Sequence, residues 1–433
     1  MKFRVVAGLA VALAVLLSPS SAAASLAQPA VVSANPADWT PRLPVDSTSA
    51  VYVLHQVGTT MYVGGAFATL AGAARSNVAS FGATTGALLG FAPNVNGAVW
   101  AVVPTADGQL VLGGTFTSVN GVARVGLAKV NATTGALDPT FAPTLGGKVT
   151  DAQLVGARLI VSGTFGKRLA ALDPFTGRDT GYLNLGITGT VASNAGPTQV
   201  YRFAVDPQGA HLVAIGNFTT VAGQGRSRAF MATLGSTAGT LNAWSYQPLT
   251  RMCQAASEPD YLRDVDFSPD GTYFVVVSTG YVSQAGDLGL TLCDATARFE
   301  TLNASPTRPT WINYTGGDTL HSVVVTGAAV YVGGHQRWLN NPQGKDSAGP
   351  GALSRPGIGA INPTTGLALT WDPRRARGVG AKALYATTAG LWVGSDTSTG
   401  GALGCSVPGG PNHDDCAGKA LESHPGIGFL PLP

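Results

Sequence analysis

The amino-acid sequence predicts an all-β fold, a seven-bladed β-propeller, and three observations support that prediction. One short segment recurs seven times along the chain. No stretch shows the long 3.6-residue periodicity of amphipathic helices. The chain also contains 58 glycines and 27 prolines, which interrupt helices and mark turns between strands. With 11% charged and 45% hydrophobic residues, the composition is too apolar for a disordered chain.

The recurring segment is clearest at residues 61–67, 110–116, 159–165 and 213–218, and weaker copies lie at 275–281, 330–335 and 391–396. Its first two copies read Met-Tyr-Val-Gly-Gly-Ala-Phe and Leu-Val-Leu-Gly-Gly-Thr-Phe. Successive copies are 49 to 63 residues apart. A four-stranded propeller blade with its loops needs about 40–50 residues, so each copy predicts one blade. A β-sandwich is compatible with short strands but does not explain seven similar units.

Turn residues divide the second repeat into four predicted strands. Residues 99–104 form the first strand, and the turn at 106–108 leads into the second at 110–116. A loop at 118–121 precedes the third strand at 125–130. A Thr-Thr-Gly turn at 133–135 then precedes the fourth strand at 137–142, and its glycine supplies the positive φ of a short hairpin.

The two ends of the chain predict how the last blade is completed. The seventh repeat stops after its third strand, at residues 426–430. The missing strand is expected at the other end, because residues 37–42 resemble the fourth strand of the sixth repeat at 368–374. We therefore expect an N-terminal strand to complete the last blade, which removes a free sheet edge.

The first 24 residues have the pattern of a secretory signal peptide. Lys2 and Arg4 precede an apolar run at residues 5–17, and small residues follow up to Ala24. The run is short for a bilayer span, and no second run of that length follows. We expect residues 25–433 to form a single propeller domain that is secreted into the extracellular space, with no membrane span.

The cysteines and the net charge limit the possible ligands. Oxidation of exported thiols predicts two disulfides; three pairings are possible, and pairing within a repeat favours Cys253–Cys293 and Cys405–Cys416. No CxxC spacing supports a metal site, and no cofactor or metal is expected.

A net charge of +3 gives no strong positive field that would hold a polyphosphate backbone, so nucleic acid is not an expected partner. We expect a monomer.

The pattern in the first repeat also resembles a known family. Tyr-Val-Gly-Gly-Ala-Phe at 62–67, Gly-Ala-Ala-Arg at 72–75, Thr-Thr-Gly at 84–86 and Phe-Ala-Pro at 91–93 resemble the delta-60 repeat β-propellers of secreted bacterial proteins. The pattern is also similar to kelch-type blades. The resemblance covers essentially all of residues 25–433, with degenerate copies in the fifth to seventh repeats. It implies a propeller fold and export, and carries no established catalytic residues.

One rim of the predicted propeller gathers the candidate ligand-binding residues. The first strand of each blade lines the central channel, and its start shares a rim with the end of the antiparallel second strand. Aligned on the repeat, the first strands begin at Tyr52, Trp100, Thr150, Arg202, Asp264, His321 and Lys382. The second strands of the sixth and seventh blades end at His335 and Asp396, where the earlier blades carry mostly small or neutral residues.

The longest loops leave the same rim, at residues 336–356 and 397–425. Long loops in a compact fold are often functional. Arg337 beside Trp338 offers a forked donor and a flat ring to a sugar or carboxylate, unless the two side chains only pack within their own loop. His413, Asp414 and Asp415 lack the alternating oxygen ligands of a calcium loop, which favours a solvated acidic tip.

We expect a non-catalytic protein that binds a carbohydrate or protein ligand on this rim. No GxSxG, HExxH, Walker or GxGxxG motif occurs. The alternative is an extracellular polysaccharide lyase or hydrolase in which His321 or His335 is the base and Tyr52, Arg202 or Lys382 stabilises charge. A third hypothesis is a structural role at the cell surface. Asp264 and Asp266 share a strand face but precede a turn, where aspartates commonly bond the backbone.

Overall fold

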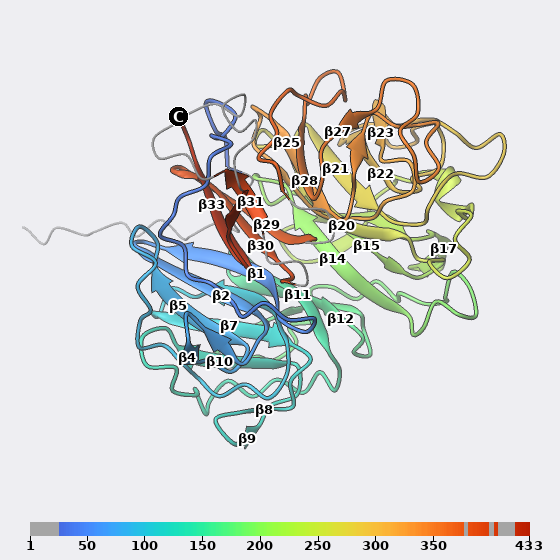
Figure 1. The fold of residues 1–433 in the computed structure, drawn as a ribbon. Helices are drawn as coiled ribbons and strands as arrows, with labels where there is room; N and C mark the ends of the chain where they lie inside the picture. The colour runs from blue at the N-terminus through green and yellow to red at the C-terminus, as the bar shows by residue number, and fades with distance from the viewer. Residues whose placement is uncertain (1–25, 376–379, 398–401, 406–420) are drawn as a thin grey trace, which may run out of the picture.

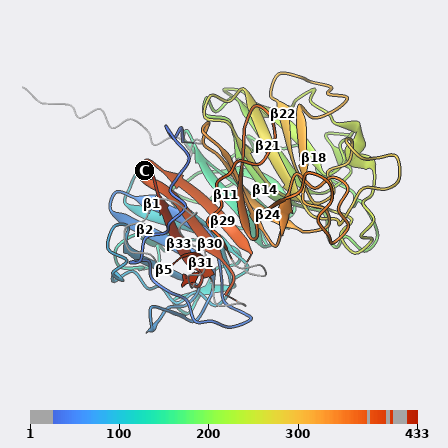
Figure 2. The same cartoon turned by 45° about the horizontal axis from the view of Figure 1, so that its top comes forward.

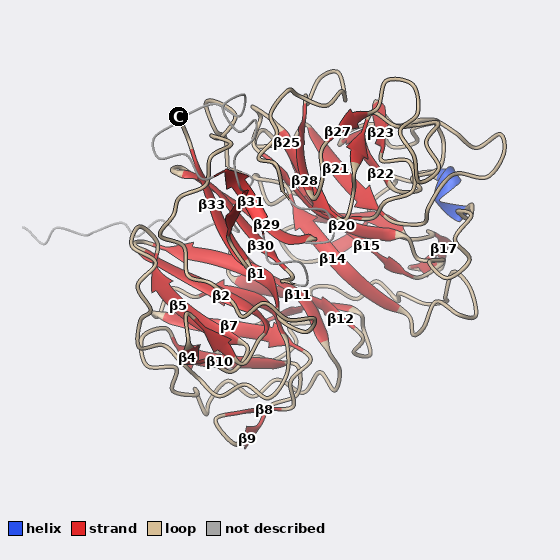
Figure 3. Ribbon diagram, viewed as in Figure 1, coloured by secondary structure: helices blue, strands red, loops and turns tan. Residues whose placement is uncertain are grey.

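Strands make up almost all of the regular structure in the computed structural model, which describes residues 26–375, 380–397, 402–405 and 421–433 (Figure 3). One short 3-10 helix, η1 (Gln247–Thr250), interrupts them. Across these described ranges, no helix is long and apolar enough to cross a bilayer. The expected signal peptide, residues 1–24, lies outside the described part.

Seven antiparallel sheets of three or four strands follow one another along the described chain (Figure 1). The first three contain β1 (Ala50–Val57), β2 (Thr60–Ala66) and β5 (Val78–Gly82); β6 (Val99–Pro104), β7 (Gln109–Gly114) and β10 (Leu127–Asn131); and β11 (Val149–Val155), β12 (Arg158–Gly163) and β13 (Leu169–Leu172). The fourth and fifth contain β14 (Gln199–Val205), β15 (His211–Asn217), β18 (Ala229–Leu234) and β19 (Gly239–Leu241); and β20 (Leu262–Phe267), β21 (Tyr273–Ser278), β22 (Ala295–Glu300) and β23 (Trp311–Tyr314). The sixth and seventh contain β24 (Leu320–Val325), β25 (Val330–Gly334) and β28 (Ile358–Ile361); and β29 (Ala381–Thr387), β30 (Gly390–Ser395) and β33 (Ile427–Pro431).

Five small hairpins follow the second strands of the first, second, fourth, sixth and seventh sheets. They pair β3 (Thr69–Leu70) with β4 (Ala73–Ala74), β8 (Ser118–Val119) with β9 (Val122–Ala123), β16 (Thr220–Val221) with β17 (Gln224–Gly225), β26 (Trp338–Leu339) with β27 (Leu353–Ser354), and β31 (Ala402–Cys405) with β32 (Leu421–Ser423). These hairpins lie where second strands end and first strands begin. We call this side of the molecule the loop rim.

The first strands of the sheets lie next to one another around the middle of the molecule (Figures 1 and 2). Each contacts the first strand of the following sheet, in the order β1, β6, β11, β14, β20, β24 and β29, and β29 in turn contacts β1. These seven first strands are called inner strands below. Later strands of each sheet lie farther out.

Paired glycines at the ends of the second strands allow this close approach. A Cβ on Gly113 would lie 2.8 Å from Val149 Cγ1 on the next inner strand. A Cβ on the following Gly114 would overlap the carbonyl oxygen of Ala98, at the start of its own sheet. Gly64, Gly333 and Gly394 face the next inner strand in the same way. The Gly-Gly pair thus provides the space in which consecutive sheets pack.

The hydrophobic core lies between neighbouring sheets. One cluster joins Tyr62 and Val78 of the first sheet to Val99 and Leu112 of the second, all buried. A similar cluster joins Val51 and Phe81 of the first sheet to Trp392, Ile427 and Phe429 of the seventh. Each sheet is therefore buried on both faces by its neighbours, which explains its nearly continuous apolar strands.

The expected N-terminal strand is not a regular strand, although the chain follows the expected path. Residues 33–43 have no strand assignment but make three backbone hydrogen bonds to the seventh sheet: Ser33 N to Pro431 O, Ala37 N to Phe429 O and Leu43 N to Pro425 O. Trp39 packs 5.6 Å from Trp392, measured between ring centroids. The prediction of a strand was wrong here; widely spaced hydrogen bonds take its place, interrupted by Pro36 and Pro41, which have no N–H to donate.

The fourth strands are also shorter than the sequence predicts. Residues 137–142 reduce to one bridge, between Val130 and Leu137. Asp138 Oδ1 instead accepts a hydrogen bond from Thr140 N at 2.8 Å, and Pro139 lies between them. An Asx turn and a residue without an N–H end the ladder. The preceding Thr-Thr-Gly turn is confirmed, with φ of 73° at Gly135.

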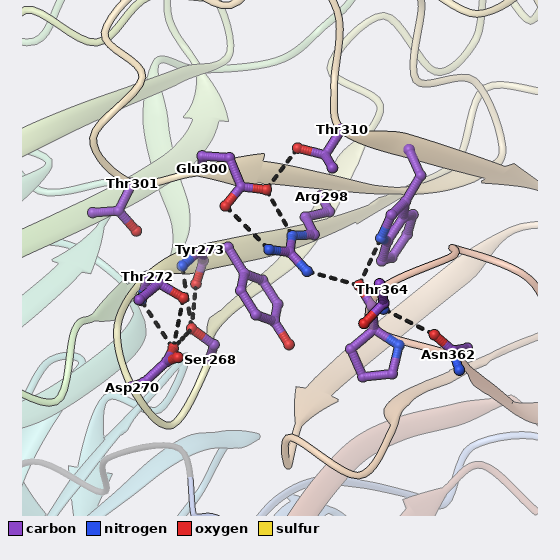
Figure 4. A network of polar contacts seen from close by, with 12 residues as sticks. Ser268, Asp270, Thr272, Tyr273, Arg298, Glu300, Thr301, Thr310, Asn362 and Thr364 are labelled. Atoms are coloured by element: carbon purple, nitrogen blue, oxygen red, sulfur yellow. Dashed lines mark hydrogen bonds and ion pairs between the residues drawn. The ribbon is translucent and has the colours of Figure 1, made fainter.

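A polar network joins the fifth and sixth sheets at the rim opposite the loop rim (Figure 4). Arg298 Nη1 and Trp311 Nε1 both donate to Pro363 O at 2.8 Å. Arg298 also pairs with Glu300 at 2.8 Å and lies over the ring of Tyr273. Contacts of this kind hold the turns of this rim together, whereas long loops such as residues 340–352, between β26 and β27, leave the loop rim.

The disulfide Cys253–Cys293 is present, as the sequence predicts. It joins the connection before the fifth sheet to the loop between β21 and β22, across a sequence separation of 40 residues. The second expected disulfide, Cys405–Cys416, involves a residue outside the described part. Of residues 397–425, the structure describes Thr397, 402–405 and 421–425.

We predict that Gly114→Ala destabilises the fold by about 1–3 kcal/mol, because the new Cβ would overlap backbone, which cannot rotate away. Gly90→Ala is the matched control, since a Cβ on that exposed glycine would meet no atom within 4 Å and its φ is not positive. Chemical unfolding of both variants measures the difference. Equal free energies of unfolding for the two variants would contradict the packing role of the glycine pair.

We also predict that replacing Cys253 and Cys293 together by serine lowers the free energy of unfolding by about 4 kcal/mol. That value is the loop-closure entropy expected for this separation. Thermal unfolding of the variant should match that of the reduced wild-type protein. A double variant as stable as the oxidised wild type would show that the bond contributes nothing to stability.

Candidate functional site

A β-bulge near the start of every inner strand builds the mouth of the channel at the loop rim. In each sheet, the register between the inner strand and the second strand shifts by one residue close to the start of the inner strand. A bulge leaves one residue out of the ladder and redirects its side chain. The seven extra residues, called the mouth ring, are Tyr52, Trp100, Thr150, Tyr201, Arg263, His321 and Lys382.

The bulges correct the sequence alignment in the fourth and fifth sheets. Arg202 and Asp264 were expected at the ring, but they lie one residue farther along, and Tyr201 and Arg263 occupy the bulges. In those sheets the second strand carries Ile215 and Val277 where the motif has its first glycine. The third sheet also lacks this glycine, with Ser162 in its place, yet Thr150 was placed correctly, so the missing glycine alone does not explain the shift.

Four predicted residues from the sixth and seventh sheets meet at this mouth. His321 and Lys382 belong to the mouth ring, while His335 and Asp396 follow the last residues of β25 and β30; we call the four the mouth cluster. Lys382 Nζ lies 3.2 Å from His321 Nε2 and 3.6 Å from Asp396 Oδ2. His335 Nε2 lies 3.2 Å from the same carboxylate oxygen, and the two imidazole centroids are 4.9 Å apart.

Burial and neighbouring charges shift the pKa values in the mouth cluster. Burial, and then the charge of Lys382, hold the pKa of His321 well below its usual value. Burial also lowers the pKa of Lys382, against the attraction of Asp396. For Asp396, burial acts to raise the pKa, but the hydrogen bond from His335 and the charge of Lys382 leave it lowered. At neutral pH His321 is therefore a neutral ring whose Nε2 accepts a hydrogen bond from the lysine.

An aromatic pair continues the mouth beside this cluster. The rings of Tyr52 and Trp100 stack at 4.2 Å between centroids and 5° between planes. Both residues are partly exposed. Burial, and then the nearby charge of Asp396, raise the pKa of the Tyr52 hydroxyl. The mouth thus places flat aromatic surface next to paired polar groups, a combination typical of ligand sites.

Below the mouth lies a channel cavity of about 420 Å³. Of the predicted residues, Tyr52, Arg202, Asp264 and Lys382 line it. Its charged wall is formed mainly by carboxylates from the third and fifth sheets. The cavity therefore continues from the mouth cluster toward the opposite rim, where Leu26 contributes to its lining.

The channel carboxylates bind backbone amides of the following inner strand. Asp151 Oδ2 accepts from Phe203 N at 3.1 Å, Asp264 Oδ2 from Val323 N at 3.0 Å, and Asp266 Oδ2 from Val325 N at 2.8 Å. These amides lie on strand edges that have no neighbouring strand in their own sheet, so the carboxylates satisfy them. Burial raises the pKa of Asp264 to about 6, against the charge of Arg202.

Arg337 and Trp338 lie close to each other, and their contacts are with neighbouring loops and with the β26–β27 hairpin. Arg337 Nε and Nη2 each donate to a carboxylate oxygen of Asp318 at 2.8 Å, and Nη2 also pairs with Asp346. The guanidinium carbon lies 4.4 Å from the centre of the Trp338 ring. Trp338 itself pairs with Ser354 in the β26–β27 hairpin. Neither residue lines the channel cavity.

Comparisons with known proteins agree with this architecture. A family described as a domain of unknown function (DUF5122) beta-propeller matches residues 105–141, within the second repeat. A Bacteroides uniformis protein proposed to be a 6-phosphogluconolactonase superposes with a TM-score of 0.50 at 12% identity, covering 89% of this chain and 98% of that one. The chain has a β-propeller fold.

Two further comparisons add little to this result. The WD40 β-propeller domain of Doa1 is similar with a TM-score of 0.46 at 11% identity, covering 82% of this chain and 93% of that domain. No curated protein matches the chain. The comparisons therefore establish the fold of the propeller, and its function must be argued from the site.

We predict that the free energy of unfolding falls as pH rises through the pKa of Asp264. Its pKa is about 6 in the folded chain against the ordinary 3.8, so the folded state holds the proton more tightly. This contribution is complete below pH 4 and is lost by about pH 7, on the order of 3 kcal/mol. Asp264→Asn should flatten that part of the profile, measured by urea unfolding across pH.

Asp270→Asn is the control of opposite sign. Hydrogen bonding, first from Ser268, lowers the pKa of Asp270, so its contribution is lost as pH falls below about 4. If Asp264→Asn leaves the wild-type profile between pH 4 and 7 unchanged, the assigned burial of this carboxyl group is wrong.

Proposed function

We propose that the protein is a secreted, monomeric propeller that binds an extracellular carbohydrate or protein ligand at the mouth of its channel without catalysis. The observation that carries this proposal is the juxtaposition of the Tyr52–Trp100 stack with the mouth cluster. Together they offer aromatic surface, one carboxylate, one lysine and two imidazoles around an open cavity. Sites with this mixture bind polar ligands by surface contact and a few oriented hydrogen bonds.

The proposal includes seven blades in a closed ring, with the N-terminal segment completing the last blade. Several contacts between the ends of the series support closure. β29 contacts β1, a bridge joins Ala50 to Asp396, and Gly394 faces Val51 as the other motif glycines face their following strands. The delta-60 resemblance and the apolar leader at residues 5–17 support export, and the Cys253–Cys293 bond fits an oxidising compartment.

The channel carboxylates support binding over hydrolysis. A glycosidase needs two carboxyl groups free to exchange protons or attack the sugar. Asp151, Asp264 and Asp266 are each committed to backbone amides of the next strand. Removing one would leave an inner-strand N–H without its acceptor, so these groups serve the framework.

One observation favours the alternative of a polysaccharide lyase or hydrolase. His321 is a neutral imidazole at neutral pH, as a general base must be, and Lys382 lies next to it to stabilise negative charge. In the structure, however, the Nε2 lone pair of His321 faces the lysine. A base role requires that contact to open when substrate binds, and a turnover measurement decides between the two functions.

We predict that the oxidised protein is retained on at least one preparation in a panel of polysaccharides and cell-wall materials, without releasing fragments. Trp100→Ala and Lys382→Met should each lower affinity at least about tenfold, since each removes a central contact of the mouth. Mass spectrometry of retained protein and of the soluble fraction measures both outcomes.

His211→Ala is the matched control, because His211 lies at the start of β15, away from the loop rim, and should bind normally. Fragments released by the wild type and lost in His321→Ala would replace the binding function with the enzymatic one. Retention that is unchanged in Trp100→Ala and Lys382→Met would exclude the mouth as the binding site.

A further inference from the structure

A second group of polar side chains lies where the two ends of the described chain meet. Asp38 belongs to the N-terminal segment that follows the seventh sheet, Glu422 to β32, and His424 to the connection between β32 and β33. Atoms able to bind a metal, one from each residue, all lie within 4.8 Å of one another. None of the three residues belongs to the mouth cluster, and no part of the proposed function uses them.

The imidazole of His424 is fixed from behind by a residue outside the group. Its side chain is 1% exposed, and its Nδ1 lies 3.1 Å from the hydroxyl of Thr40, which is also buried. This contact turns Nε2 toward Glu422 Oε2, 3.0 Å away. In metal sites, a partner on the second ring nitrogen orients the ligating histidine in the same way. Asp38 is exposed, so one side of the group is open to solvent.

The charges of the group favour a cation between these atoms. Two carboxylates face one buried imidazole, and their two negative charges outnumber the one nearby positive charge that acts on His424, that of Arg42. An imidazole nitrogen and carboxylate oxygens are ligands that bind zinc in proteins.

We propose that Asp38, Glu422 and His424 form a divalent metal site, with zinc as the ion that suits one imidazole nitrogen and two carboxylate oxygens. The ion would bind His424 Nε2 and one oxygen from each carboxylate, and water would complete the coordination on the open side. Binding through Nε2 requires the tautomer with its proton on Nδ1. A neutral ring protonated on Nε2 therefore gives up that proton and takes one up at Nδ1, with no net release, and Nδ1–H then donates to Thr40 Oγ1. Calcium and magnesium, which prefer oxygen ligands alone, are the disfavoured ions.

Such a site ties the two ends of the propeller together. Asp38 precedes the first inner strand, whereas Glu422 and His424 come after the last second strand, so the three assemble only in the folded chain. An ion that binds only the folded state raises its apparent stability as the ion concentration rises. Zinc would therefore hold the N-terminal segment against the seventh sheet, beside the hydrogen bonds already described.

The test is calorimetric titration of the oxidised, chelator-treated protein with zinc chloride, together with thermal unfolding in zinc, calcium and magnesium. We expect one zinc ion per chain, and a rise in Tm with zinc only. Asp38→Asn should lower zinc affinity at least about tenfold, and His424→Gln should abolish stoichiometric binding. Asp38 is exposed, so its variant should fold and remains decisive if His424→Gln does not fold.

His211→Gln is the matched control, because His211 Nδ1 pairs with Asp206 at 2.8 Å but lacks a third ligand among the described residues. This variant should bind zinc like the wild type. The proposal is overturned if the wild type binds no stoichiometric zinc, or if it binds zinc equally well in the Asp38→Asn and wild-type proteins. Loss of binding in the His211→Gln variant would also overturn it, by placing the ion elsewhere.

Thr40 is assigned as a positioning residue, and a conservative pair of variants tests this role. Thr40→Val should lower zinc affinity about 10–100-fold, whereas Thr40→Ser keeps the hydroxyl and should restore it. X-ray absorption at the zinc edge should show imidazole scattering in the wild type and in Thr40→Ser. A spectrum without imidazole scattering would exclude His424 as a ligand.

Discussion

The close packing of each inner strand against the second strand of the preceding sheet is the constraint on which the rest of the structure depends. Glycine at positions such as Gly113 makes room for the inner strand of the next sheet. Its neighbour Gly114 makes room for the carbonyl group of Ala98, which precedes the inner strand of the same sheet. A side chain at Gly113 or Gly114 would overlap the neighbouring strand, whereas the fourth and fifth sheets accommodate Ile215 and Val277 at the first position. Once the sheets are this close, their faces bury one another, and the channel edges of the inner strands must find acceptors. Carboxylates such as Asp264 and Asp266 supply them.

This arrangement separates the framework from the site. The bulge in each inner strand takes one residue out of the ladder, so that residue carries no pairing requirement and its identity is free to vary between blades. The mouth ring accordingly contains aromatic, hydroxyl, cationic and imidazole side chains, although the strands around it are alike. Chemistry concentrates in the sixth, seventh and first blades because His335 and Asp396 follow second strands there, next to Lys382 and Tyr52.

Periodic features could be predicted from the sequence, and features that depend on contacts between distant segments could not. The Gly-Gly repeat predicted the β-propeller fold, and its alignment brought His321, His335, Lys382 and Asp396 to one mouth. It misplaced Arg202 and Asp264 by one residue, because a bulge changes the register of a strand and no residue type in the sequence marks where it occurs. The ion pairs of Arg337 depend on Asp318 and Asp346, in separate loops. The Asp38 group depends on residues almost a whole chain apart.

The hydrogen bonds between residues 33–43 and the seventh sheet have a consequence for how the chain acquires its structure. A ribosome makes the N-terminal segment first and its partners, near Pro425 to Pro431, among the last. The N-terminal segment therefore has no partner until the seventh sheet is in place, whichever of the other sheets have already packed. Its pairing closes a loop of nearly the whole chain, so it carries a larger loss of chain entropy than contacts between consecutive sheets.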